Sequence, residues 1–134
     1  MLILDANVLV SAALGRSREL IEATATRGIE LLLPIEQRRE AVSVLIRLGG
    51  SPESVERSLT FAADIVGLLE PEVYTPFEPP ARARLGPRGQ SDWPVLPTAI
   101  ALDADIWSND RDFFGTGVAV WTKRNVGHAA PLTA

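Results

Sequence analysis

Short apolar runs alternate with longer helix-like segments along this chain. Each run is short and ends at turn residues, so we interpret the runs as buried β-strands. The expected strands are residues 2–4, 29–33, 72–75, 105–108 and 118–121. Strands that alternate with helices are typical of a parallel sheet with helices on both faces. The sequence therefore predicts an α/β fold, a three-layer α/β/α sandwich with a central, mainly parallel five-stranded sheet.

Capping residues set the expected helix boundaries. Ser17 can cap one helix and Gly28 ends it, while Ser51-Pro52-Glu53 combines an N-cap, an initial proline and an acid at the positive helix end. The expected helices are residues 6–14, 18–27, 35–48, 52–69, 81–85 and 92–102. Because the helix over 52–69 would be apolar on two sides, we expect a second copy to cover part of it in a homodimer.

Length and composition favour one domain. The chain has 134 residues, of which 46% are hydrophobic, enough for one core. We expect a single domain over residues 1–134, with an irregular tail at 123–134. No run reaches the roughly 18 apolar residues of a membrane helix. The chain has no cysteine, which fits a reducing compartment. We therefore expect a cytoplasmic protein without membrane contacts.

Several acidic residues are expected at one edge of this sheet. Ligands of parallel sheets bind beyond the carboxyl ends of the strands, so acids that emerge there are candidates for a site. They come from the end of the first strand, the loop after the fourth strand and the first turns of two helices. These acids are Asp5, Asp110, Asp112, Asp92 and Glu40.

Such carboxylates repel one another unless a cation neutralises them. Oxygen ligands without Cys or His favour Mg²⁺ or Mn²⁺ over zinc. A bound ion of this kind lowers the pKa of water, orients a phosphodiester and stabilises the leaving oxygen. The net charge of −4 gives no general basic surface for nucleic acid, but gathered acids are what a metal-dependent nuclease needs. The acids therefore predict metal-assisted hydrolysis of a phosphate ester.

Four motifs, in order, resemble the PIN domain family. They are the run from Leu2 to Val10, Pro34 followed by Glu40, the segment from Asp92-Trp93-Pro94 to Leu102, and Trp107 to Phe113. The resemblance implies a PIN-like fold and a Mg²⁺- or Mn²⁺-dependent ribonuclease with RNA as substrate. The family includes the VapC-like toxins, which pair with an antitoxin protein. It also implies particular roles: metal-binding catalytic residues Asp5, Glu40, Asp92 and Asp110, a helper or second-metal ligand Asp112, and supporting polar residues Asn7 and Ser108.

Three arginines before Asp92 are candidates for phosphate contacts, namely Arg82, Arg84 and Arg88. The alternative is that they lie on a solvated loop face.

Each acid also has a purely structural interpretation. Asp5 would cap a helix, Asp110 would form an Asx-turn, and Glu40 would be a solvated helix acid with Glu36 as a rival ligand. A phosphatase of the HAD type would need a second aspartate where Asn7 stands, and a receiver domain fails for similar reasons. The remaining alternative is a non-catalytic module that keeps the fold and binds RNA or protein.

Overall fold

The computed structural model describes residues 1–129, and for residues 88, 91 and 92 the backbone alone. An all-parallel sheet lies at its centre, in the order β3-β2-β1-β4-β5. Its strands are Leu2–Leu4 (β1), Leu31–Pro34 (β2), Val66–Leu69 (β3), Asp105–Trp107 (β4) and Val120–Trp121 (β5). The predicted five-stranded α/β/α sandwich is therefore confirmed.

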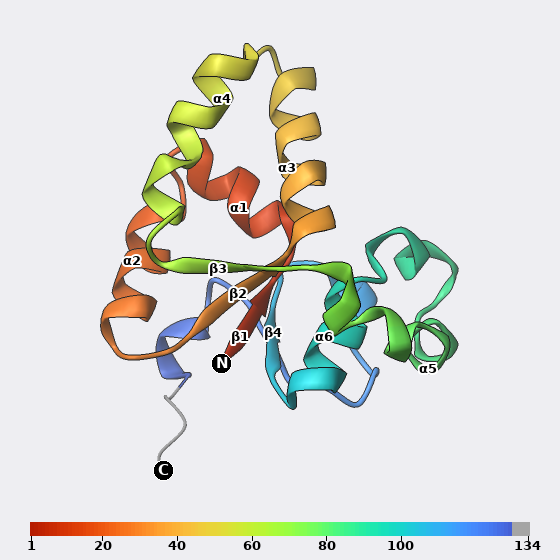
Figure 1. The fold of residues 1–134 in the computed structure, drawn as a ribbon. Helices are drawn as coiled ribbons and strands as arrows, with labels where there is room; N and C mark the ends of the chain where they lie inside the picture. Colours follow the sequence, from red (N-terminus) through yellow and green to blue (C-terminus); the bar gives the residue numbers. More distant parts are fainter. Residues whose placement is uncertain (130–134) are drawn as a thin grey trace.

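Helices cover both faces of this sheet (Figure 1). They are Ala6–Ala13 (α1), Arg18–Thr26 (α2), Ile35–Arg47 (α3), Pro52–Leu59 (α4), Glu78–Arg84 (α5) and Val95–Leu102 (α6). Successive strand residues point to opposite faces, so Leu2 and Leu4 pack with α1–α4, whereas Ile3 packs with α5 and α6. Among the described residues, none of these helices could cross a membrane.

Most of the predicted boundaries of the central elements differ by one or two residues. β2 begins at Leu31 rather than at residue 29, and β5 begins at Val120 rather than at residue 118. Ser17 is at the expected N-cap of α2, but its hydroxyl bonds the Ser11 hydroxyl at 2.8 Å instead of the helix backbone. The core strands thus follow from their apolar runs, while the expected side-chain cap of α2 is absent.

The helix predicted over 52–69 is wrong beyond Leu59. It starts as expected, because the Ser51 hydroxyl accepts from the Ser54 amide at 3.1 Å. A 3-10 turn (η1, Thr60–Ala62) then leads into β3, which pairs with β2. Strand pairing overrides the helical periodicity, and Val66 packs into the core of the chain itself. The long two-sided helix from which we inferred a homodimer does not exist.

The region between β3 and α6 departs most from the prediction. The strand expected at 72–75 is wrong: these residues lie in two 3-10 turns, Pro71–Val73 (η2) and Thr75–Phe77 (η3). Pro71 and Pro76 flank the segment and fix φ within the two turns, which favours these turns over a strand. The helix expected from Asp92 begins only at Val95, because Pro87–Asp92 forms another 3-10 segment (η4).

Of the predicted irregular tail, the structure describes residues 123–129, and residues 130–134 lie outside the described residues. The described part contains a 3-10 turn, Val126–His128 (η6), which Arg27 fixes to the end of α2. The Arg27 guanidinium donates to the carbonyl oxygens of Gly127 at 2.6 Å, Ala129 at 2.9 Å and Val126 at 3.0 Å. A planar guanidinium suits such a cluster of acceptors.

Arg27→Lys is expected to lower the free energy of unfolding by about 1 kcal/mol, because an ammonium cannot reproduce the fixed fork of donors. Urea denaturation followed by circular dichroism measures the change. Arg16→Lys, at an exposed arginine in the turn between α1 and α2, is the matched control and should leave the stability unchanged. Equal losses in both variants would contradict the assigned role of Arg27.

Candidate functional site

The strand order places a crevice between β1 and β4. From β1 the chain adds β2 and β3 on one side, and it then returns to add β4 and β5 on the other. Connections that leave two neighbouring strands in opposite directions open a crevice at their carboxyl ends, where α/β folds bind ligands. Asp5 directly follows β1, and Ser108 directly follows β4. Two of the predicted site residues therefore meet at this point.

Asp5 is buried, with 3% of its surface exposed. Its Oδ1 accepts from the Val8 amide at 3.1 Å, so it does cap α1, as the structural interpretation requires. Its Oδ2 accepts a hydrogen bond from the Ser108 hydroxyl. The same carboxylate therefore caps a helix and contacts the loop after β4. Asn7, one turn into α1, is exposed.

Ser108 connects Asp5 to Asp110. Its buried hydroxyl donates to Asp5 and accepts from the Asp110 amide at 2.9 Å, which fixes the orientation of the hydroxyl. Asp110 Oδ1 in turn accepts from the Asp112 amide at 2.9 Å, which is the Asx-turn anticipated as its structural role. These contacts form one hydrogen-bonded series from Asp5 through Ser108 and Asp110 to the backbone of Asp112.

The segment that carries Asp92 lies at the same edge. The side chain of Asp92 is outside the described residues, but the backbone of η4 packs against the 3-10 turn Arg111–Phe113 (η5). The approach is close at Gly89, where an added Cβ would lie 3.2 Å from the Asp112 Cβ. The fold thus brings η4 beside the loop that holds Asp110 and Asp112.

Glu40 is not grouped with these residues. Its side chain is half exposed and faces Arg47 at 3.8 Å. Among the residues whose side chains the structure describes, no three Asp, Glu, His or Cys side chains form a group that could hold a metal ion. The structure therefore joins Asp5, Ser108 and Asp110 through hydrogen bonds, while the described contact of Glu40 is with Arg47.

Gln37 is a site residue that the sequence analysis missed. It is buried, and its Oε1 accepts from the Ala6 amide at 2.9 Å, so it fixes the start of α1 next to Asp5. Gln37, Ala41 and Leu45 form the buried stripe of α3 at intervals of four residues. A polar residue in phase with an apolar stripe was the signal that could have identified it.

Tyr74 is fully buried near the start of α3, with the Trp93 ring 5.8 Å from its own. Burial raises the pKa of its hydroxyl far above the usual value, and the negative charge of Glu36 raises it further. Glu36, the alternative to Glu40 as a metal ligand, therefore interacts electrostatically with the buried hydroxyl of Tyr74.

The native protein is therefore expected to form tyrosinate only well above pH 10, because the raised pKa keeps Tyr74 neutral. The associated stability is complete below the ordinary tyrosine pKa of about 10 and is lost as the pH rises above it. Tyr74 is the one tyrosine of the chain, so absorbance at 295 nm reports it alone. Urea-unfolded protein is the control and should titrate near pH 10. A native titration at that same pH would refute the buried placement.

The candidate phosphate-binding arginines differ in their surroundings. The Arg82 guanidinium bonds Glu78 at 2.7 Å and Gln90 Oε1 at 3.1 Å, and it stacks over the Trp93 ring at 5.0 Å. Arg84 donates to the Thr116 carbonyl at 3.3 Å. The side chain of Arg88 lies outside the described residues. Arg82 therefore already has protein partners for its charge.

A cavity of about 560 Å³ lies elsewhere, between α1, α3, η1 and the edge strand β3. Its walls are mainly apolar and include Leu9, Leu59 and Leu68, with Arg38 and Arg39 also in the lining. Asp5 and the other predicted acids do not line it. We therefore separate this cavity from the acidic site.

The family model for the PIN domain matches residues 3–130, which is nearly the whole chain. No curated protein matches the chain.

Proposed function

Since this chain belongs to the PIN domain family, whose fold is of a nuclease type, we propose that it is a metal-dependent endoribonuclease that hydrolyses RNA phosphodiester bonds. The observation that carries the proposal is the hydrogen-bonded series Asp5–Ser108–Asp110 at the crevice between β1 and β4. Two carboxylates at the carboxyl ends of neighbouring strands are well placed to act on one phosphate.

The residues present suit Mg²⁺ or Mn²⁺. We propose that Asp5, Asp92 and Asp110 hold the ion, with Asp112 as a helper or second-metal ligand, because hard divalent cations prefer carboxylate oxygens. When bound, such an ion activates water and stabilises the charge on the leaving oxygen. Glu40 would join this set by turning away from Arg47. That movement is inexpensive, because an exposed ion pair at 3.8 Å contributes little stability.

The chain prepares this site before any ligand binds. Ser108 holds one oxygen of Asp5, the Asp110 amide holds Ser108, and Gln37 holds the start of the helix that Asp5 caps. Supporting bonds of this kind orient carboxylates and reduce the motion needed during reaction.

Purified protein is expected to cleave single-stranded RNA with Mg²⁺ or Mn²⁺, to stop in EDTA, and to recover when the metal is returned in excess. Gel electrophoresis of an end-labelled RNA follows the reaction. The Asp5→Asn variant, purified in parallel, shows whether a contaminating ribonuclease is present. Cleavage that continues undiminished in EDTA would contradict the proposed metal dependence.

We further propose that the enzyme is a toxin restrained by an antitoxin protein. The cavity beside β3 supports this role, because apolar walls with two arginines suit an acidic amphipathic segment. Copurification with the product of a short upstream reading frame, and loss of cleavage in that complex, would support it. The homodimer stays a prediction, although the helix that suggested it ends at Leu59, and sedimentation would test it.

The alternative function is a non-catalytic module that keeps the fold and binds RNA or protein. Titration calorimetry separates the two functions, since a nuclease should bind Mg²⁺ or Mn²⁺ and a module that only retains the fold should bind neither.

A further inference from the structure

We propose that single-stranded RNA binds beside the acidic site on a surface centred on Phe114, which stacks on an unpaired base while neighbouring cations contact phosphates. The proposal rests on the ribonuclease function and names how the substrate is held. The residues involved are Asn109, Arg111, Phe114, Lys123 and Arg124, which we call the Phe114 surface.

Phe114 is an exposed side chain on a turn that hydrogen bonds stabilise. Its neighbour Phe113 is completely buried among the side chains under α5 and α6, whereas Phe114 is 54% exposed. The Phe114 amide donates to the Arg111 carbonyl at 3.0 Å, and the Thr116 hydroxyl donates to the Phe113 carbonyl at 2.7 Å. The Phe114 ring is therefore exposed to solvent, while core packing and hydrogen bonds fix the backbone that carries it.

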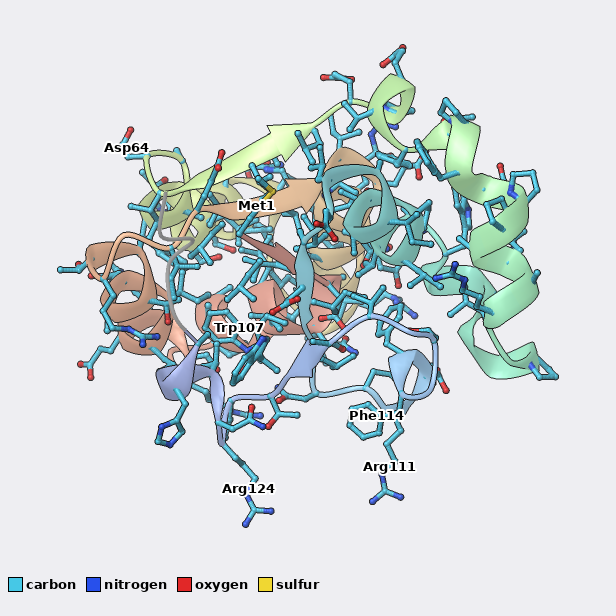
Figure 2. The ribbon with its side chains drawn as sticks, turned by 90° about the horizontal axis from the view of Figure 1, so that it is seen from below. Met1, Asp64, Trp107, Arg111, Phe114 and Arg124 are labelled. Atoms are coloured by element: carbon cyan, nitrogen blue, oxygen red, sulfur yellow. The ribbon has the colours of Figure 1, made fainter. Side chains whose placement is uncertain are left out.

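Three exposed cations lie on the loop that carries this ring and on the turn after β5. Arg111, Lys123 and Arg124 are exposed, and none of them forms an ion pair within the part of the chain that the structure describes. The Lys123 amide donates to Asn109 Oδ1 at 3.0 Å, which holds the turn after β5 beside the loop that carries Asp110. Figure 2 shows Arg111, Phe114 and Arg124 projecting from the same side of the molecule.

This combination suits unpaired RNA. The chain has a net charge of −4 and gathers acids at its crevice, so a phosphate backbone needs nearby positive charge to approach. Arginines beside an exposed aromatic ring supply both interactions that sequence-tolerant single-strand binders use, phosphate contacts and base stacking. Bases in a duplex are already stacked, so the ring would select unpaired RNA. Arg111 directly follows Asp110, and a strand held here would pass next to the acids.

Binding is measured apart from cleavage, with a fluorescent 12-nucleotide single-stranded RNA and the intact chain in EDTA at low salt. Phe114→Ala and Phe114→Leu are expected to weaken binding about tenfold, since stacking on one base is lost. Phe114→Trp should restore it. Phe77→Ala is the matched control, because Phe77 is an exposed phenylalanine on η3, and its affinity should equal that of wild type.

The cations are tested through the salt dependence. Arg111→Gln and Arg124→Gln should each weaken binding and reduce the slope of log K against log salt by about 0.7, the value for one single-strand phosphate contact. Arg16→Gln, in the turn between α1 and α2, should leave the slope unchanged. A duplex of the same sequence should bind equally to wild type and to Phe114→Ala.

Unchanged affinity in the Phe114 variants would overturn the proposal, as would wild-type protein that does not bind the RNA. An altered sedimentation coefficient of Phe114→Ala with unchanged RNA affinity would also overturn it and would assign this face to a protein contact. RNA binding through Phe114 without cleavage in Mg²⁺ or Mn²⁺ would instead uphold the surface and refute the nuclease function.

Discussion

Asp5→Asn is expected to lower RNA cleavage by about three orders of magnitude, the loss that corresponds to several kcal/mol of transition-state stabilisation. Asparagine has the same shape but lacks the negative charge that would hold Mg²⁺ or Mn²⁺. The fold should persist, because an asparagine oxygen can still accept the Val8 amide and cap α1. The measurement is the single-turnover cleavage rate, with the melting temperature recorded for each preparation.

Asp64→Asn is the matched control for this variant. Asp64 is exposed, and Figure 2 shows it on the opposite side of the molecule from Arg111. Its cleavage rate should equal that of wild type. A rate for Asp5→Asn within a few-fold of wild type, in folded protein, would remove Asp5 from the proposed site.

Trp107→Ala should cost about 3–5 kcal/mol of folding free energy, the usual range for removing a large aromatic side chain from a core. Trp107 is fully buried on β4, next to β1 in the middle of the sheet. Small domains have only about 5–15 kcal/mol in total, so this variant should be partly unfolded at 37 °C. Urea denaturation at 15 °C measures the loss.

Trp107→Phe is the informative companion. The Trp107 Nε1 is buried and has no hydrogen-bond partner within the described part of the chain, so phenylalanine removes an unsatisfied donor along with some apolar surface. We expect a smaller loss than for alanine. Trp121 pairs with Trp107 in the sheet. Unlike the Trp107 Nε1, the Trp121 Nε1 has a hydrogen-bond partner, because it donates to Asp105 at 2.9 Å. An alanine variant as stable as wild type would contradict the placement of Trp107.

The predictable parts of the fold are those that local chemistry decides. Leu2–Leu4 is a short apolar run that can only be buried, and Ser51 starts α4 through its own neighbours. The wrong parts depend on partners distant in sequence. Residues 66–69 continue a helical pattern, but they pair with β2, and Gly67 lies so close that an added Cβ would be 2.9 Å from Leu32. Single-sequence periodicity cannot reveal such a pairing.

The same distinction applies to the site. Asp5 and Ser108 follow strands directly, so the rule for parallel sheets located both. Glu40 was expected at the site because it lies in the first turns of the helix that follows the second strand. In the structure Gln37, Ala41 and Leu45 are the buried residues of α3, while Glu40 is half exposed and faces Arg47. The rotation of a helix about its axis depends on what it packs against, which the sequence does not state.

The bond between Ser108 and Asp5 joins residues 103 positions apart. During synthesis the first aspartate leaves the ribosome long before the strand that holds its partner. A nascent or truncated chain that stops before β4 therefore has the amino-terminal helices but no paired carboxylates. For the ribonuclease proposed above, which would be made on an RNA template, this order of assembly would delay formation of the site until most of the chain has been translated.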